Sequence, residues 1–261
     1  MNLSDHIALA ALAAGKEILK VYENEFTVAY KTDQSPLTLA DSKSHDIITQ
    51  YLEQTPYPVL SEEGRDIPFE ERSTWPYYWL VDPLDGTKEF VTRTGEFTVN
   101  IALIHQGKPV LGAVYTPVKK WLYIGSEGEG AWKLELQDHQ LPENWKEAGQ
   151  RLPLKLDQER SYTVVGSRSH KSKETDAFIA KLEKKHGQLN FVSMGSSLKI
   201  CLVVEGTADI YPRLAPTMEW DTAAGDAVAR SAGYQVVQYE NGDPLLYNKE
   251  NLLNPWFIVQ R

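Results

Sequence analysis

One segment, residues 77–90, constrains what this chain can fold into more than any other. Its first five residues are aromatic or apolar and predict a buried strand. We expect that strand to end at Asp82-Pro83, because a proline cannot continue a central hydrogen-bonded ladder. Gly86 then lets the backbone come close to a ligand. The segment therefore predicts a rigid turn at the mouth of a strand, carrying the carboxylates of Asp82 and Asp85.

The paired carboxylates of this turn have the chemistry of a metal site. Hard cations such as Mg²⁺ prefer oxygen ligands from carboxylates and backbone carbonyls. An ordinary acidic surface turn is the alternative, and it would be the better interpretation of a bare Asp-Pro. The agreement of strand, proline, paired acids, Gly86 and Thr87 favours the metal site.

Two further acidic positions lie far from this turn in the sequence. Glu62 lies in an acidic segment that closes a short apolar strand, and by itself it would be a solvated turn residue. Asp221 follows Trp220 and is expected to open a helix, where aspartate is a favoured N-cap. Such a carboxylate can still offer its free oxygen outward as a metal ligand, and phosphate groups bind at helix N-termini.

The bulk properties limit the class of protein. The chain has 261 residues, which is ample for one large core or two fused lobes. Its formal net charge is -9 and it has no dense run of lysine and arginine, which disfavours a binder of nucleic-acid duplexes. An acidic protein that handles an anionic ligand needs local positive charge, from metal ions or from a few well-placed cationic side chains.

The single cysteine and the N-terminus indicate the compartment. One cysteine, Cys201, permits no intrachain disulfide, which fits a reducing compartment. Residues 7–15 are apolar and rich in alanine, but Asp5 and His6 precede them in place of a positively charged segment. The run is also too short to span a bilayer. We therefore expect an amphipathic helix and a cytoplasmic protein without an integral membrane segment; loose attachment to the inner face of a membrane stays open.

Periodicity predicts an α/β (α+β) chain in two parts. Helices are expected at about 5–22 and 38–53, and strands at 97–105 and 108–116 form a hairpin at Gln106-Gly107. From about residue 160, strands and helices alternate, which favours an α/β arrangement. The polar segment 138–156 is the best boundary. We therefore expect an N-terminal α+β lobe, 1–150, and a C-terminal α/β lobe, 151–261.

Cationic and hydroxyl side chains stand at the ends of elements in the C-terminal lobe. His170 follows a predicted strand, Ser196 and Lys199 open a predicted helix, and Arg213 closes a strand. Each of these residues is weak evidence for a binding site by itself, since such residues are usually solvated or in surface ion pairs. Because open α/β sheets bind ligands at the carboxyl ends of their strands, these groups together would suit a polyanionic ligand between the lobes.

Asp33 and Thr87 form a candidate catalytic pair. A threonine hydroxyl is not a base by itself, but it can take a proton from an attacking water if a carboxylate accepts its own proton. Nothing in the sequence places the two side chains in contact, so the pair is a geometric hypothesis.

Three acidic motifs together resemble a known family. They occur in the order and at the separations of the metal-site motifs of the inositol monophosphatase-like superfamily of Mg²⁺-dependent, lithium-sensitive phosphatases. The matching segments are Ser61-Glu62-Glu63, residues 79–87 and Trp220-Asp221-Thr222-Ala223-Ala224-Gly225. Within that superfamily, residues 31–36, 88–90, 95–104 and 195–199 favour resemblance to the 3′(2′),5′-bisphosphate nucleotidases.

The resemblance implies a fold and a set of site residues. The fold would be a layered α-β-α-β-α sandwich of the sugar phosphatase type. Two or three Mg²⁺ ions would be bound, and Asp33 with Thr87 would activate the attacking water. The implied metal ligands are the carboxylates of Glu62, Asp82, Asp85 and Asp221 and the backbone carbonyl of Leu84. The implied substrate contacts are Glu62, Leu84, Asp85, Gly86, Thr87, His170, Ser196, Lys199, Arg213 and Asp221.

The implied activity is removal of the 3′-phosphate of adenosine 3′,5′-bisphosphate to give AMP and phosphate, with action on 3′-phosphoadenylyl sulfate as well. An inositol or sugar monophosphatase with the same metal site is one alternative. A catalytically silent nucleotide-binding regulator is another, although intact Asp33 and Thr87 argue against it. The expected partner is a small nucleotide and not a nucleic acid. The choice between monomer and homodimer stays open.

Overall fold

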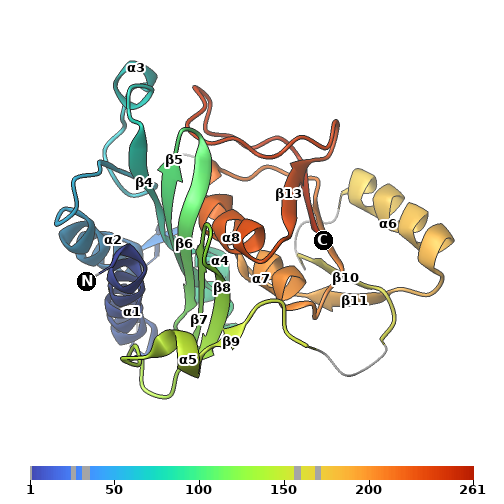
Figure 1. The fold of residues 1–261 in the computed structure, drawn as a ribbon, viewed down its shortest axis with the longest axis horizontal. Coiled ribbons are helices and arrows are strands. Elements are labelled where there is room, and N and C mark those ends of the chain that lie inside the picture. The colour runs from blue at the N-terminus through green and yellow to red at the C-terminus, as the bar shows by residue number, and fades with distance from the viewer. Residues whose placement is uncertain (1, 25–27, 31–35, 156–159, 168–171) are drawn as a thin grey trace.

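The computed structural model describes residues 2–24, 28–30, 36–155, 160–167 and 172–261, and it consists of alternating helical and sheet layers (Figure 1). Helices α1 and α2 form one outer layer, followed by a seven-stranded sheet, the pair α7 and α8, a five-stranded sheet and finally α6 (Figure 1). The expected α-β-α-β-α sandwich is therefore confirmed. Among the described residues, no helix combines the length and the apolar character needed to cross a bilayer.

The two N-terminal helices, α1 (Leu3–Tyr22) and α2 (Leu39–Leu52), pack against each other and cover one face of the seven-stranded sheet. Thr38 caps α2, because its hydroxyl accepts a hydrogen bond from the Ala40 amide at 3.1 Å. In return, Asp41 Oδ2 accepts from the Thr38 amide at 2.8 Å, which completes a capping box. The reciprocal cap fixes where α2 begins, and both predicted helices are confirmed.

The larger sheet has the order β3-β4-β5-β6-β7-β8-β9. Only β3 and β4 pair in parallel; the other neighbours are antiparallel. Gln106 and Gly107 both adopt positive φ in the predicted two-residue hairpin turn. The strands are β3 (Val59–Ser61), β4 (Tyr77–Asp85), β5 (Thr98–His105), β6 (Lys108–Thr116), β7 (Trp121–Ser126), β8 (Gly130–Glu135) and β9 (Gln150–Arg151).

Strand β4 does not end at Asp82-Pro83, contrary to the sequence prediction, but continues to Asp85. Strand β3 pairs only as far as Val81, so beyond that residue β4 is paired on one side only, with β5. The register with β5 shifts between Asp82 and Asp85, and Pro83 lies in the resulting bulge. A proline is tolerated in such a place because its missing N–H leaves no ladder bond unmade.

The smaller sheet has the order β11-β10-β12-β14-β13, with β10 parallel to both neighbours and β14 antiparallel to both of its own. Its strands are β10 (Thr163–Gly166), β11 (Asn190–Ser193), β12 (Ile210–Arg213), β13 (Gln235–Gln238) and β14 (Phe257–Gln260). The helices between them are α6 (Lys173–His186), α7 (Leu198–Glu205) and α8 (Glu219–Ser231). The predicted alternation is confirmed; a division into lobes 1–150 and 151–261 stays a prediction.

Short elements complete the described chain. Strands β1 and β2 pair in an antiparallel ribbon, and Cys201 is buried in α7 as expected. The remaining elements are β1 (Val28–Tyr30), β2 (Pro36–Thr38), α3 (Phe69–Arg72), α4 (Thr87–Val91) and α5 (Trp145–Ala148).

Helix α8 packs directly on the backbone of the larger sheet at two paired glycines beneath it. Gly112 on β6 and Gly125 on β7 are directly opposite each other in register. A Cβ on Gly112 would be 2.5 Å from the Ala224 carbonyl oxygen, and one on Gly125 would be 2.5 Å from the Val228 Cα. Because both obstacles are backbone atoms of α8, any side chain at these positions would push the helix away from the sheet.

We therefore predict that Gly112→Ala lowers the free energy of unfolding by about 1–3 kcal/mol, the usual cost of overpacking a core. Denaturant titration with circular dichroism would measure it. Ser126→Ala, one residue after Gly125 on β7, is the matched control and should change stability by less than about 0.5 kcal/mol. Equal denaturation midpoints for Gly112→Ala and wild type would show that the close approach of α8 is not required.

Candidate active site

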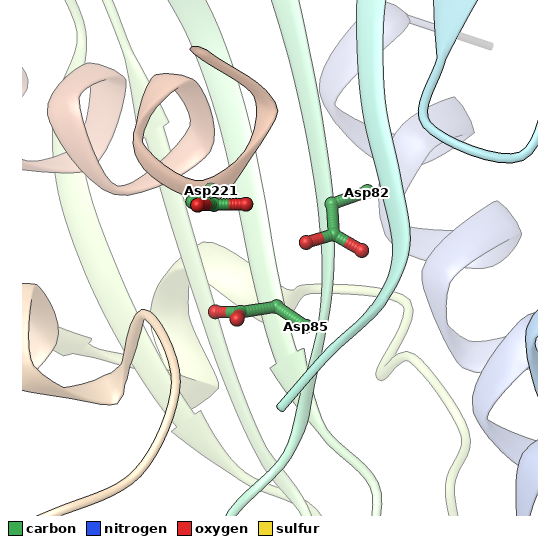
Figure 2. A group of neighbouring side chains, drawn as sticks. All are labelled: Asp82, Asp85 and Asp221. Atoms are coloured by element: carbon green, nitrogen blue, oxygen red, sulfur yellow. The ribbon is translucent and has the colours of Figure 1, made fainter. Parts of the chain in front are cut away.

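Asp82, Asp85 and Asp221 converge at one end of the larger sheet. Each offers a carboxylate oxygen, and the three oxygens lie within 4.8 Å of one another. Figure 2 shows the three carboxylates facing a common space, two from the end of β4 and one from the first turn of α8. The structure therefore brings together three of the five predicted metal ligands.

Each of these carboxylates is fixed by a backbone N–H. Asp82 Oδ1 accepts from the Leu84 amide at 3.0 Å, and Asp85 Oδ2 accepts from the Ser197 amide at 2.6 Å. Asp221 Oδ2 accepts from the Met218 amide at 2.8 Å. One oxygen of each carboxylate is thus held by the protein, which orients the group as a ligand.

The position of Asp221 in its helix differs from the prediction. Helix α8 begins at Glu219, so Asp221 is its third residue and not the N-cap. Its side chain reaches back to the amide of the residue before the helix, which is how an acid at this position satisfies an unpaired N–H of the first turn. The expectation that one oxygen is used at the helix start and the other faces outward is unaffected.

Burial and neighbouring negative charges raise the pKa of all three groups. Burial is the main reason that the pKa of Asp82 lies well above its usual range, followed by the charges of Glu62 and Asp85. Burial likewise raises the pKa of Asp85 to about 6 and that of Asp221 to about 8, with Asp85 repelling Asp221. A divalent cation would reverse this effect, and an all-oxygen anionic donor set is the kind that hard cations select.

Glu62 and Leu84 lie beside this cluster. The Glu62 amide donates to the Val81 carbonyl at 3.1 Å, which holds the residue after β3 against β4. Its charge contributes to the raised pKa of each of the three aspartates. The Leu84 carbonyl oxygen lies 3.4 Å from the Thr87 hydroxyl oxygen, as the more distant of two acceptors for its single hydrogen. Direct ligation by Glu62 and by the Leu84 carbonyl stays a prediction.

Thr87 has a carboxylate partner that the sequence analysis missed. Its hydroxyl donates to Asp41 Oδ1 at 3.3 Å, and Asp41 is only 2% exposed. Burial is the main cause that raises the pKa of Asp41 to about 6. The predicted partner, Asp33, lies outside the described residues. The available sequence signal was the capping box of Thr38 and Asp41, which placed Asp41 at a helix start but could not show that it reaches Thr87.

Seven of the ten predicted substrate residues line a cavity of about 350 Å³, and Glu62 and Leu84 are not among its lining residues. Asp85, Gly86, Thr87 and Asp221 form one side, and Ser196, Lys199 and Arg213 form another. A second cavity of about 230 Å³ adjoins it and shares Ser167, Tyr211 and Arg213. His170 lies outside the described residues. Negative and positive side chains thus face one space, as a metal-bound polyanion would require.

Gly86 and Lys199 are the most constrained residues of this cavity. Gly86 has φ 90, a left-handed conformation that glycine adopts without strain, and it turns the chain from β4 into α4. The Lys199 ammonium donates to the Ser196 carbonyl at 2.5 Å. Burial lowers the pKa of Lys199 to about 8, although the neighbouring Asp85 opposes the shift. The ammonium is therefore largely desolvated and held close to the carboxylates.

The raised pKa values predict how metal-free protein responds to pH. A carboxylate whose pKa is raised in the folded state contributes stability that is lost as the pH rises through that pKa, here about 6 for Asp85 and about 8 for Asp221. Chelator-treated protein should thus melt at a lower temperature at about pH 9 than at about pH 5.5. Added Mg²⁺, which needs ionised ligands, should raise the melting temperature most at high pH.

The control for this melting experiment is Asp82→Asn, which removes one of the repelling charges. Its chelator-treated form should show a flatter pH profile and a smaller Mg²⁺-induced increase in melting temperature than wild type. Identical pH profiles with and without Mg²⁺ in wild type would contradict the assignment of this cluster as a cation site.

Comparison with known proteins places the chain in a family. The profile of the inositol monophosphatase family matches residues 3–256. A protein of Salmonella typhimurium named 3′(2′),5′-bisphosphate nucleotidase CysQ is 47% identical over 260 residues, 98% of both chains. The crystal structure of CysQ from Bacteroides thetaiotaomicron has a TM-score of 0.89 and 52% identity, covering 99% of this chain and 98% of the other. The crystal structure of SuhB from Bartonella henselae has the same fold, with a TM-score of 0.78 and 24% identity, covering 100% of this chain and 94% of the other. The chain belongs to the inositol monophosphatase family, which is metal-dependent.

Proposed function

We propose that this protein is a 3′(2′),5′-bisphosphate nucleotidase that removes the 3′-phosphate of adenosine 3′,5′-bisphosphate and releases AMP and phosphate. We include 3′-phosphoadenylyl sulfate as a second substrate. The observation that carries the proposal is the juxtaposition, in one cavity, of a carboxylate cluster with Ser196, Lys199 and Arg213. The full-length relatives named 3′(2′),5′-bisphosphate nucleotidase support the same reaction.

Mg²⁺ is the metal we propose, as two or three ions. Asp82, Asp85 and Asp221 would hold it, together with Glu62 and the carbonyl of Leu84. When bound, Mg²⁺ neutralises phosphate charge, activates the attacking water and stabilises the leaving oxygen. The phosphate to be cleaved would lie against the backbone of Gly86 and Thr87, which the left-handed Gly86 leaves uncovered by a side chain.

Thr87 and Asp41 would move the proton of the attacking water. The Thr87 hydroxyl already donates to Asp41 Oδ1, so it can take a proton from water at its oxygen as it passes its own to the carboxylate. Asp41 is in turn oriented by two hydrogen bonds from Thr38 to its other oxygen. Burial raises the pKa of Asp41, which makes this carboxylate a better proton acceptor. A role for Asp33 in the same step stays a prediction.

The second phosphate of the substrate would bind to the cationic side of the cavity. Nine buried side-chain polar atoms of the described residues have no hydrogen-bond partner, and two of them, Ser196 Oγ and Arg213 Nε, belong to residues that line this cavity. Buried polar atoms of this kind are rare in proteins unless a ligand or water completes them. Lys199 adds a desolvated positive charge beside them. These groups suit a 5′-phosphate, and the adjoining 230 Å³ cavity leaves room for the nucleoside.

Substitutions in the proposed proton relay test whether Asp41 or Asp33 accepts the proton from Thr87. Thr87→Ala and Asp41→Asn should each lower kcat for 3′,5′-bisphosphate hydrolysis by about 10²–10⁴-fold, because both remove a link in proton transfer. Phosphate release with Mg²⁺ measures the effect, and Asp82→Asn serves as the metal-site variant. Full activity of Asp41→Asn together with an inactive Asp33→Asn would transfer the role to Asp33. Full activity of Thr87→Ala or Asp82→Asn would refute the site.

Removal of a phosphate-binding cation tests the substrate class. We predict that Lys199→Met raises KM for adenosine 3′,5′-bisphosphate by about tenfold or more, since a lost charged hydrogen bond costs about 1.5–3 kcal/mol. KM for 3′-AMP, which lacks the 5′-phosphate, should change far less. Lys184→Met, on an exposed turn of α6, is the matched control and should leave both values unchanged.

The same assay distinguishes the alternatives. Faster hydrolysis of inositol 1-phosphate than of the bisphosphate nucleotide would favour an inositol monophosphatase, and tight nucleotide binding without turnover would favour a silent regulator. The family resemblance further implies inhibition by lithium, which a titration in the same assay measures. Monomer or homodimer state and cytoplasmic location stay predictions.

A further inference from the structure

One face of α2 contacts three of the segments that build the metal centre. Asp41, Ser44 and His45 are spaced i, i+3 and i+4, so they project from the same side of the helix. Asp41 contacts Thr87, as described above. Ser44 contacts the segment between Asp82 and Asp85, and His45 contacts the segment before Glu62. The proposed proton transfer uses only Asp41 from this helix, so the hydrogen bonds of Ser44 and His45 need a separate explanation.

Ser44 binds the middle of the β4 bulge. Its hydroxyl donates to the Pro83 carbonyl at 2.7 Å, and its side chain is fully buried, with an exposed fraction of 0%. The register of β4 with β5 is irregular between Asp82 and Asp85, so the sheet does not fix the backbone there as it does elsewhere. A hydrogen bond to Pro83 therefore fixes the peptide that connects the two aspartate ligands.

His45 binds the end of β3. Its Nδ1 and the Ser61 hydroxyl share a hydrogen bond of 2.9 Å, and Ser61 is 7% exposed. Glu62 follows directly, and the Gly64 amide closes the turn onto the Ser61 carbonyl at 3.1 Å. The imidazole therefore fixes Ser61, the residue that directly precedes Glu62.

We propose that Ser44 and His45 are positioning residues that set the distance between the Glu62 segment and the Asp82–Asp85 segment, with α2 as the common rigid support. The inference rests on the proposed function only in taking these segments as the metal centre. Helix α2 is suited to this role because its start is fixed by the capping box and because it packs on α1. Groups that orient metal ligands in this way typically contribute about 10–100-fold to metal affinity.

The test measures metal binding directly, by calorimetric titration of Mg²⁺ into chelator-treated protein. Ser44→Ala and His45→Leu should each weaken Mg²⁺ binding by about tenfold. His45→Asn, whose amide can replace Nδ1 near Ser61, should recover most of the affinity. In the activity assay, the variants should need more Mg²⁺ for half-maximal rate, while kcat at saturating Mg²⁺ stays near wild type.

Two substitutions on the same helix are controls. Ser42→Ala removes a hydroxyl from the exposed side of α2. Ile48→Val removes a methyl group from a buried apolar side chain that lies one turn beyond Ser44 and takes no part in the hydrogen bonds of Ser44 and His45. Ile48→Val should lower the melting temperature and leave Mg²⁺ affinity unchanged. If Ser44→Ala does not fold, the comparison of His45→Leu with His45→Asn carries the test, because His45 is only half-buried.

Wild-type Mg²⁺ affinity in Ser44→Ala and His45→Leu would overturn the inference, and so would a loss of affinity in His45→Asn as large as in His45→Leu. The proposed function is judged separately, by nucleotide hydrolysis in the wild type. A wild type that binds Mg²⁺ but does not hydrolyse the nucleotide would refute the proposed activity. The positioning role of Ser44 and His45 would then be judged from the Mg²⁺ affinities of their variants alone.

Discussion

Three carboxylates from β4 and α8 approach within 4.8 Å of one another in a largely buried place. Negative charges that are close and desolvated repel strongly, which is why burial and neighbouring charge raise the pKa of Asp82 and Asp221. Without a cation, the chain would separate these groups if its scaffold allowed it. The surrounding structure opposes that separation, and its stiffness keeps the cluster in the geometry that the proposed metal site requires.

The scaffold acts on the cluster from several sides. Gly112 and Gly125 bring α8, and with it Asp221, against the larger sheet. On β5, Thr98 and Asn100 lie opposite Asp85 and Asp82 in register. Both hydrogen-bond to the Ser197 hydroxyl, at 2.9 and 2.8 Å, while the Ser197 amide donates to Asp85. This buried network ties the start of α7 to the strand beneath the cluster, so α7 also helps to set its geometry.

The sequence was sufficient for features that depend on short segments. The helix that starts near Thr38, the hairpin turn at Gln106-Gly107 and the acidic motifs are local, and the predicted layers followed from the resemblance that these motifs carry. The errors arose where a distant segment decides the outcome. β4 passes through Pro83 because β3 ends early, which no local pattern reveals. Asp41 gained its partner only through the packing of α2 on the sheet.

The two sides of the cavity are built from different kinds of structure, and this bears on specificity in the proposed function. The carboxylate side depends on backbone features, such as the bulge at Pro83 and the left-handed Gly86, that single substitutions disturb easily. The cationic side consists of side chains at the start of α7 and the end of β12, Lys199 and Arg213 among them. Exchange of such side chains leaves in place the backbone hydrogen bonds that orient the carboxylates, such as the one from the Ser197 amide to Asp85. A fold of this design can therefore retain its metal chemistry while the cationic side changes the anion that it recognises.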